Sequence, residues 1–266
     1  MSALAVIGTG VMGETMIGGL LRAGWSAEDL IAADRYAGRR QEVQERHHVR
    51  VADTVEAVAD AETILLVVKP QDLSGLLPEI AASLRAGALV VSLCAGVRIA
   101  TLEQALPTDT PVVRVMPNTP AQVSAGMAAL SAGSCAQQVH VERAVGIMSA
   151  VGAAVVVPES YQDAVTAVSG SGPAYLFLVA EAMIDAGVGL GLPRDVATTL
   201  TQQTLFGSAK LLVDSDDSAT VLRERVTSPA GTTAAALGML EERGLRAAFG
   251  AALRAARDRS AELGQV

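Results

Sequence analysis

Short runs of aliphatic and β-branched residues recur through the first 158 residues of the chain. Most are continuous rather than alternating in polarity, which is typical of strands buried on both faces of a parallel sheet. Segments of helical length, such as residues 13–23 and 76–84, separate them. This alternation predicts an α/β fold with a doubly wound sheet. The predicted strands are Leu4–Ile7, Leu30–Ala33 and residues 63–68, 89–93, 112–115 and 155–157, with residues 127–130 as a weaker candidate.

After about Pro158 the strand-like runs end, and hydrophobic positions follow the period of a helix. One helix face near the C-terminus carries Leu245, Ala248, Phe249, Ala252, Leu253 and Ala256. Pro173 is tolerated in the first turn of a further helix. We therefore predict two domains, an α/β domain over residues 1–158 and an all-helical domain over residues 159–266.

Composition narrows the class of protein. Lys and Arg number 20 and Asp and Glu 28, so the formal charge is −8, which argues against a nucleic-acid partner. The longest apolar region, residues 174–192, is interrupted by Glu181 and Asp185, whose charges are costly in lipid. No basic flank precedes the first apolar run, and two cysteines are too few for a disulfide scaffold or a metal cluster. We expect a cytoplasmic protein with no membrane partner and no metal.

A glycine-rich turn follows the first predicted strand and opens a helical segment, which is the context that a dinucleotide-binding motif requires. Gly8 permits the tight turn, Gly10 lets the backbone approach a pyrophosphate, and Gly13 allows close packing of helix and strand. The free N–H groups at the helix N-terminus would hold the anion. The sequence therefore predicts a Rossmann-type NAD(P) site at Gly8, Thr9, Gly10, Val11, Met12 and Gly13.

The end of the second predicted strand bears on the choice of coenzyme. Asp34 lies where an acidic residue commonly binds the adenosine ribose and favours NAD. Arg35, Arg39 and Arg40 follow, and guanidinium groups could hold a 2′-phosphate. For Arg39 and Arg40 a solvated charged loop is the preferred interpretation. The choice between NADH and NADPH stays open.

Three further strand ends carry small or polar residues. In a parallel sheet these ends lie where ligands bind. They comprise Val68, Lys69 and Pro70 after one strand, Cys94, Ala95 and Gly96 after the next, and Asn118 after a third. Cys94 is interpreted as a small buried residue rather than a nucleophile.

A second turn precedes an Ala- and Leu-rich helix in the helical half. Ser228, Gly231, Thr232 and Thr233 belong to it, and it presents free backbone N–H groups and hydroxyls at a helix N-terminus. Ordinary capping by Thr232 or Thr233 needs only one such residue. The concentration of hydroxyls and glycine favours a carboxylate-binding site.

Taken in order, these segments resemble the pyrroline-5-carboxylate reductase family over nearly the whole chain. The residues that carry the resemblance are 8–13, 68–70, 94–97, 116–118, 169–175 and 226–233. The resemblance implies reduction of 1-pyrroline-5-carboxylate to L-proline with NAD(P)H. It also implies a cofactor-binding Rossmann domain and a helical substrate-binding domain that interleaves into homodimers, which often assemble into decamers. Active sites would form between one subunit's cofactor domain and its partner's helical region.

The resemblance also implies roles for residues of the second turn. The backbone from Gly231 to Thr233 would hold the substrate carboxylate, with Ser228 in the same turn. The Thr233 hydroxyl would hydrogen-bond the ring nitrogen, which makes Thr233 the catalytic candidate.

On the cofactor side, residues 8–13 would bind pyrophosphate, and Asp34 and Arg35 would lie by the adenosine ribose. Residues 68–70, Ala95, Gly96 and Asn118 would surround the nicotinamide. Many members carry an Asn that touches the ribose where this chain has Thr54, a departure from the family pattern.

Two other functions remain as alternatives. The chain could be a related NAD(P)H-dependent reductase of another cyclic imine or a hydroxy acid. It could also be a non-catalytic NAD(P)-binding scaffold. Turnover of pyrroline-5-carboxylate would separate the first function from both alternatives.

Overall fold

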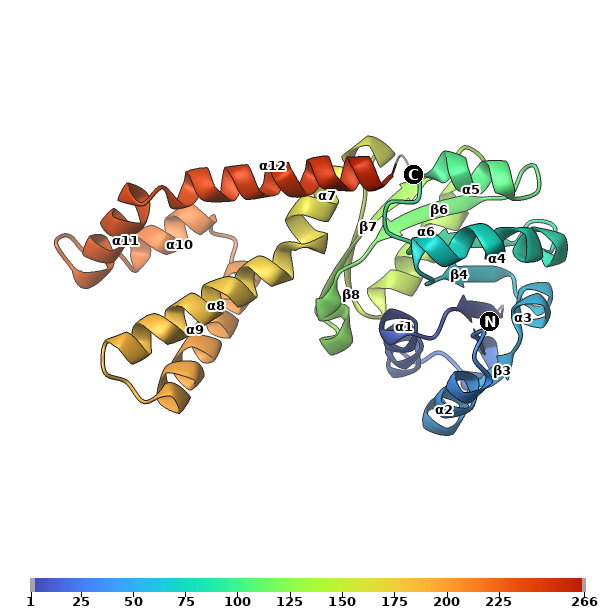
Figure 1. Ribbon diagram of the computed structural model, residues 1–266, viewed down its shortest axis with the longest axis horizontal. Helices are drawn as coiled ribbons and strands as arrows, with labels where there is room; N and C mark the ends of the chain where they lie inside the picture. The colour runs from blue at the N-terminus through green and yellow to red at the C-terminus, as the bar shows by residue number, and fades with distance from the viewer. Residues whose placement is uncertain (1–2, 265–266) are drawn as a thin grey trace. The chain divides into compact units, whose positions relative to one another are not determined.

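The computed structural model describes residues 3–264 (Figure 1). The chain divides into two compact units. The first unit is an α/β unit that runs to Ser171 and also takes in the C-terminal segment from Ala256, and the second comprises Gly172–Ala255. We call them the sheet unit and the helical unit.

The sheet unit contains an eight-stranded sheet with the order β3-β2-β1-β4-β5-β6-β7-β8. All neighbouring strands pair in parallel except β6 and β7, which are antiparallel. The doubly wound sheet predicted from the sequence is therefore confirmed. The strands are β1 Leu4–Ile7, β2 Leu30–Ala33, β3 Arg50–Ala52, β4 Thr63–Leu66, β5 Leu89–Ser92, β6 Val112–Met116, β7 Gly126–Ala132 and β8 Gly152–Val156.

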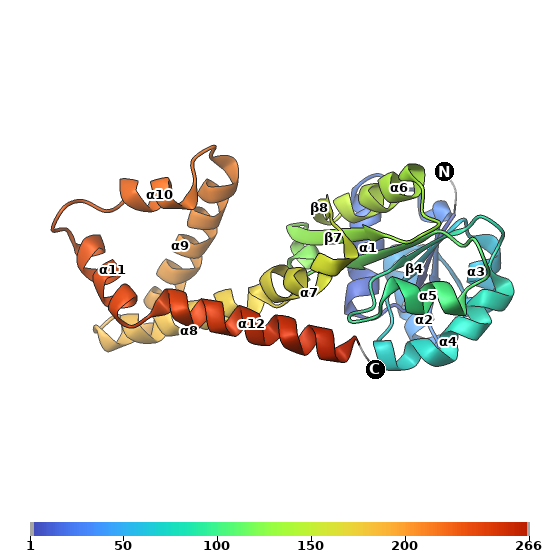
Figure 2. The same cartoon turned by 90° about the horizontal axis from the view of Figure 1, so that it is seen from above.

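Helices cover both faces of this sheet (Figure 2). Along β1, Leu4 and Val6 join one hydrophobic cluster, whereas Ala5 and Ile7 join the other. Both faces of the strand are thus buried, which explains the continuous apolar runs. The helices are α1 Val11–Arg22, α2 Ala37–His47, α3 Thr54–Asp60, α4 Pro70–Ser83, α5 Ile99–Ala105, α6 Gln138–Ser149 and α7 Gln162–Val165, followed by a π-helical turn, η4, at Thr166–Gly170. Short 3-10 turns lie at η1 Ala27–Asp29, η2 Thr119–Val123 and η3 Glu159–Tyr161.

The helical unit has almost no core of its own. Only Ala197 and Thr201 are buried between Gly172 and Ala255, all of which the structure describes. Its helices are α8 Gly172–Gly189, α9 Arg194–Asp214, α10 Ala219–Arg225, α11 Thr232–Glu242 and the first part of α12 Leu245–Leu263. Large apolar side chains of this unit stay exposed, including those of Leu176, Phe177, Leu178, Leu190, Phe206 and Val213.

One helical stretch, Glu159–Gly189, is long and apolar enough to cross a membrane by length and composition alone. Only 6% of its most apolar window is buried within the chain. A helix that packs against a second subunit has the same composition, because an obligate interface is also apolar.

Candidate functional site

The turn between β1 and α1 places three glycines in three different environments. Gly8 has φ +94°, and a Cβ there would lie 2.7 Å from the carbonyl oxygen of Val67. A Cβ on Gly13 would lie 1.9 Å from the carbonyl oxygen of Gly8. Nothing lies within 4 Å of a Cβ built on Gly10. The backbone at Gly10 is therefore the part of the turn that is open to a ligand.

The N-terminus of α1 offers hydrogen-bond donors at the same place. Gly10 is the N-cap and has no side chain to cap the helix, and the first helical bond runs from the N–H of Glu14 to the carbonyl of Gly10. The N–H groups of Val11, Met12 and Gly13 precede that bond, so they have no partner within the helix. Donors at a helix N-terminus attract phosphate. The turn therefore fits the pyrophosphate of a dinucleotide.

Asp34 holds the glycine-rich turn from the end of β2. Its Oδ2 accepts hydrogen bonds from the N–H (2.9 Å) and the hydroxyl (3.0 Å) of Thr9. Its Oδ1 accepts from the N–H of Tyr36 at 3.0 Å. Both carboxylate oxygens thus have protein partners, so Asp34 stabilises the turn. Its contact with the adenosine ribose stays a prediction.

Two arginines expected in a solvated loop lie in α2 instead, and that interpretation is wrong. Arg39 donates from Nε to the carbonyl of Thr9 (2.8 Å), and its side chain is 24% exposed. Arg40 donates to the carbonyl of Asp34 at 2.5 Å. Both therefore tie α2 to the end of β1 and β2. Arg35 differs, because it is 64% exposed, pairs with Asp72 and lies 4.8 Å over the ring of Tyr36.

Glu14 connects the first turn of α1 to α2. It accepts hydrogen bonds from Arg39, Arg46 and His47. Partial burial acts to raise its pKa, but the hydrogen bonds from these three side chains outweigh burial and lower the pKa to about 2. The carboxylate stays ionised at neutral pH and anchors the arginine that reaches Thr9.

The other strand ends predicted for the nicotinamide side lie at the carboxyl ends of β4 and β5. Lys69 is the N-cap of α4, and Pro70 is its first residue, so the missing N–H of proline costs no helical bond. Ala95 is exposed, and Gly96 has φ +76° in the left-handed region that favours glycine. Val68 is half-buried beside Gly8. Thr54 begins α3.

Cys94 is only 2% exposed, and its thiol lies 3.8 Å from the carbonyl of Leu66. Burial raises the pKa of this thiol. A buried thiol that is protonated at neutral pH is a poor nucleophile. The interpretation of Cys94 as a small buried residue is confirmed.

Asn118 follows β6 and uses its amide within the protein. The N–H of Met127 donates to Oδ1 (2.8 Å). Nδ2 donates to the carbonyl and the hydroxyl of Ser169 at 3.2 and 3.3 Å. The oxygen and the nitrogen of this amide thus both have protein partners, and the place of Asn118 on the nicotinamide side stays a prediction.

The turn before α11 lies in the helical unit. Gly231 is the N-cap, no side chain caps this helix, and the first helical bond joins the N–H of Ala235 to the carbonyl of Gly231. The N–H groups of Thr232 and Thr233 are therefore without helical partners. A Cβ on Gly231 would lie 2.3 Å from the Ser228 hydroxyl oxygen, so the glycine makes room for that hydroxyl. Capping by Thr232 or Thr233, the plain alternative, is absent here.

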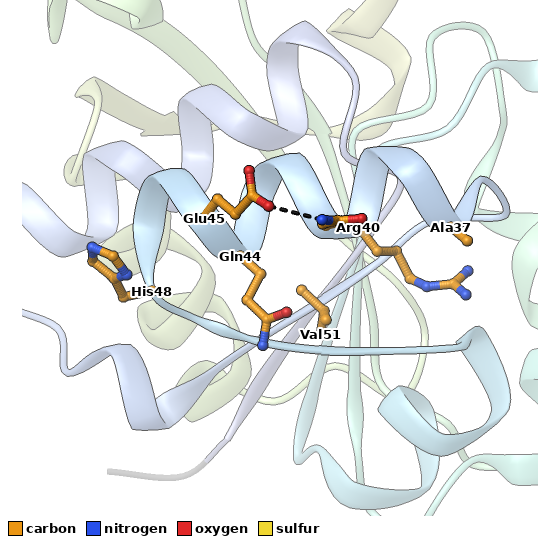
Figure 3. A pocket seen from close by; sticks show the side chains of 7 residues that line it. Ala37, Arg40, Gln44, Glu45, His48 and Val51 are labelled. Atoms are coloured by element: carbon orange, nitrogen blue, oxygen red, sulfur yellow. Dashed lines mark hydrogen bonds between the residues drawn. The ribbon is translucent and has the colours of Figure 1, made fainter.

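A groove of about 690 Å³ lies elsewhere, along α2 beside β3 (Figure 3). It is lined by Ala37, Arg40, Gln41, Gln44, Glu45, His48 and Val51. Of the residues weighed above for the coenzyme, Arg40 belongs to this lining; none of the other predicted site residues does. The close-up shows a hydrogen bond along α2, from Gln41 to Glu45, at 2.8 Å.

The fold and the two turns define a class of protein, the NAD(P)-dependent oxidoreductases of Rossmann type. Two family models match, "NADP oxidoreductase coenzyme F420-dependent" over residues 3–96 and "Pyrroline-5-carboxylate reductase dimerisation" over residues 159–263. The chain belongs to the pyrroline-5-carboxylate reductase family.

Individual relatives extend over the full length. The chain is 43% identical to pyrroline-5-carboxylate reductase of Mycobacterium tuberculosis, over 99% of this chain and 97% of the relative. It is 42% identical to that of Corynebacterium melassecola, over 100% of both. The structure of a pyrroline-5-carboxylate reductase from Coxiella burnetii superposes with a TM-score of 0.96 at 35% identity, over 100% and 99% of the two chains. That of Plasmodium falciparum pyrroline carboxylate reductase, with NADP bound, has a TM-score of 0.87 at 29% identity, over 99% and 98%.

Proposed function

We propose that the two turns described above serve the reaction of the family. The protein is an NAD(P)H-dependent oxidoreductase that reduces 1-pyrroline-5-carboxylate to L-proline, the last step of proline biosynthesis. The observation that carries the residue assignments is the pair of uncapped helix N-termini, at Gly10 and at Gly231. Coenzyme and substrate are both anions, whereas the chain carries a net charge of −8. Local backbone donors therefore have to supply the attraction that the overall charge does not.

We assign coenzyme binding to residues 1–158, the predicted NAD(P)-binding domain. Residues 8–13 would hold its pyrophosphate. The space that a Cβ on Gly10 would occupy is open, so the pyrophosphate can approach the backbone there. Val68, Lys69, Pro70, Ala95, Gly96 and Asn118 would lie on the nicotinamide side, and Asp34, Arg35 and Thr54 on the ribose side. When bound, NAD(P)H supplies the hydride. Exposed Arg35 is the arginine of this region best placed to meet a 2′-phosphate.

The substrate is assigned to residues 159–266. In the backbone segment from Gly231 to Thr233, the N–H groups of Thr232 and Thr233, with the hydroxyl of Ser228, would bind the carboxylate, because the Gly231 N–H already donates to the Ser228 carbonyl. The hydroxyl of Thr233 would hydrogen-bond the ring nitrogen. An alcohol is a poor general acid near neutral pH. We therefore propose that the substrate binds as the iminium ion, or gains its proton through water, and that Thr233 acts by orienting the ring.

The exposed apolar helices support a homodimer, in agreement with the match to the dimerisation family. We further propose that a partner's helices cover Glu159–Gly189, that dimers assemble into decamers, and that the protein is cytoplasmic. Each active site would then combine residues of two subunits. Size-exclusion chromatography with light scattering, in buffer without detergent, measures the assembly directly. A decamer supports the whole proposal, a monodisperse dimer supports the dimer interface but contradicts the decamer, and a monomer or recovery only in detergent would contradict both.

One assay tests the reaction. Purified protein is mixed with pyrroline-5-carboxylate, and oxidation of NADH and of NADPH is followed at matched concentrations. We expect turnover with proline as the product. Greater activity on a piperideine carboxylate or a hydroxy acid would favour a related reductase. Coenzyme binding without turnover on any of these would favour a non-catalytic scaffold.

A further inference from the structure

The end of the sheet unit is marked by a break in helical geometry. The N–H of Ser171 donates to the carbonyl of Thr166 at 2.8 Å, a bond that spans five residues rather than four. One residue more than in an α-helical turn is thereby enclosed by the hydrogen bond, which is what defines a π-turn. This π-turn, η4, is followed by Ser171 and then by Gly172, where the helical unit begins.

The side chain of Asn118, the single asparagine of the chain, holds this turn. A backbone N–H can only donate, so the bond from Met127 identifies the accepting atom as Oδ1 and leaves Nδ2 facing Ser169. Nδ2 then contacts the carbonyl and the hydroxyl of Ser169, in the middle of η4. Asn118 thus joins the end of β6, the start of β7 and the π-turn.

Packing brings the same elements together. Gly170, the last residue of η4, lies so close to Met116 that a Cβ would come within 2.4 Å of its terminal methyl carbon. Met116 is the last residue of β6, two positions before Asn118. The π-turn is thereby seated at the carboxyl end of the sheet, the edge that Rossmann folds use for the coenzyme. π-turns are frequent at functional sites.

We propose that Asn118 is a positioning residue for the reaction. Its amide keeps η4 in the π form and so holds the backbone of Ser169 and Gly170 at the carboxyl end of β6. It acts on catalysis through Ser169 rather than by touching the nicotinamide. This inference rests on the proposed function, because it concerns the same reaction.

The test compares Asn118→Asp with Ser131→Ala. Asn118→Asp keeps an acceptor for Met127 and replaces the donors to Ser169 by an oxygen that repels its carbonyl. Ser131 accepts a hydrogen bond from Gln162 in α7, so Ser131→Ala loosens a neighbouring anchor without touching η4. Three quantities are measured for each variant: kcat, the Kd of NADPH by fluorescence titration, and amide hydrogen exchange of residues 168–172.

For Asn118→Asp we expect kcat to fall about tenfold or more, with the Kd of NADPH within about twofold of the wild type. Exchange at residues 168–172 should accelerate by about tenfold. Ser131→Ala should leave all three close to the wild type. Unaltered exchange in Asn118→Asp overturns the proposal, as does an unaltered kcat. A Kd that rises in step with the loss of kcat overturns it too, because Asn118 would then contact the coenzyme directly. A wild type inactive on pyrroline-5-carboxylate would refute the proposed function instead, and exchange would still decide whether Asn118 holds η4.

Discussion

Substituting Gly10 separates coenzyme binding from folding. Gly10 has φ −62° and ψ −169°, which any residue adopts, and nothing lies within 4 Å of an added Cβ. We expect Gly10→Ala to change the free energy of unfolding by less than about 1 kcal/mol. The methyl group would, however, occupy the space through which a pyrophosphate approaches the N–H groups of α1.

The expected loss of affinity follows from those donors. A hydrogen bond to a charged group is worth about 1.5–3 kcal/mol, so losing one raises the Kd of NADPH about ten- to 150-fold. Fluorescence titration measures the Kd, and thermal unfolding without coenzyme measures the stability. Gly146→Ala is the matched control, since Gly146 also has open space around it but lies in α6, remote in sequence from the turn.

Two results would contradict this reasoning. If Gly10→Ala binds NADPH as the wild type does, the pyrophosphate does not approach the backbone at Gly10. If it fails to fold, the space at Gly10 is not open. Gly13→Ala provides the contrast, because its methyl group would meet the Gly8 carbonyl, and we expect that variant to lose stability as well as binding.

Three further predictions concern other parts of the molecule. Thr233→Ala should lower kcat/KM with pyrroline-5-carboxylate by about one to two orders of magnitude, the cost of a hydrogen bond to a charged group; unchanged steady-state kinetics would remove Thr233 from the mechanism. The pKa of Glu14 falls from 4.5 to about 2 on folding, so its stabilisation is present above pH 4.5 and is lost as the pH drops toward 2. Allowing for screening by solvent, Glu14→Gln should lower the free energy of unfolding by about 1–2 kcal/mol at pH 7, and urea titrations should show the difference shrinking between pH 4.5 and 2. Phe177→Asp, at a side chain 64% exposed, should shift the protein toward monomer in light scattering, and an unchanged mass would place the interface elsewhere.

Most of the sheet could be predicted from the sequence, because burial on both faces leaves continuous apolar runs. β3 was missed, since it has three residues and begins with the charged Arg50. β8 begins at Gly152, three residues before the predicted run, because glycine and alanine give no strand signal. The antiparallel pairing of β6 and β7 depends on the path of the chain between them. The spacing of hydrophobic residues carries no information on strand direction.

For the site, the spacing of glycines and hydroxyl residues in the sequence located the two turns. It did not reveal the side-chain hydrogen bonds that hold the site in place. The bonds from Thr9 to Asp34 join residues 25 positions apart, and those from Asn118 to Ser169 join residues 51 positions apart. Such contacts are set by tertiary structure, so local pattern cannot reveal them. The same holds for Arg39, whose contact with the glycine-rich turn depends on how α2 packs.

The scarcity of buried residues in the helical unit has a consequence for sequence variation. Only Ala197 and Thr201 are buried between Gly172 and Ala255. Apolar side chains that are exposed in one subunit would therefore form the hydrophobic core together with the partner subunit. A saturation mutagenesis scan should therefore find many exposed apolar positions of α8 and α9 as intolerant of polar replacement as β1. Dilution should unfold the helical unit, as denaturant unfolds a self-contained domain. Separating two subunits would remove the surface that keeps these helices folded.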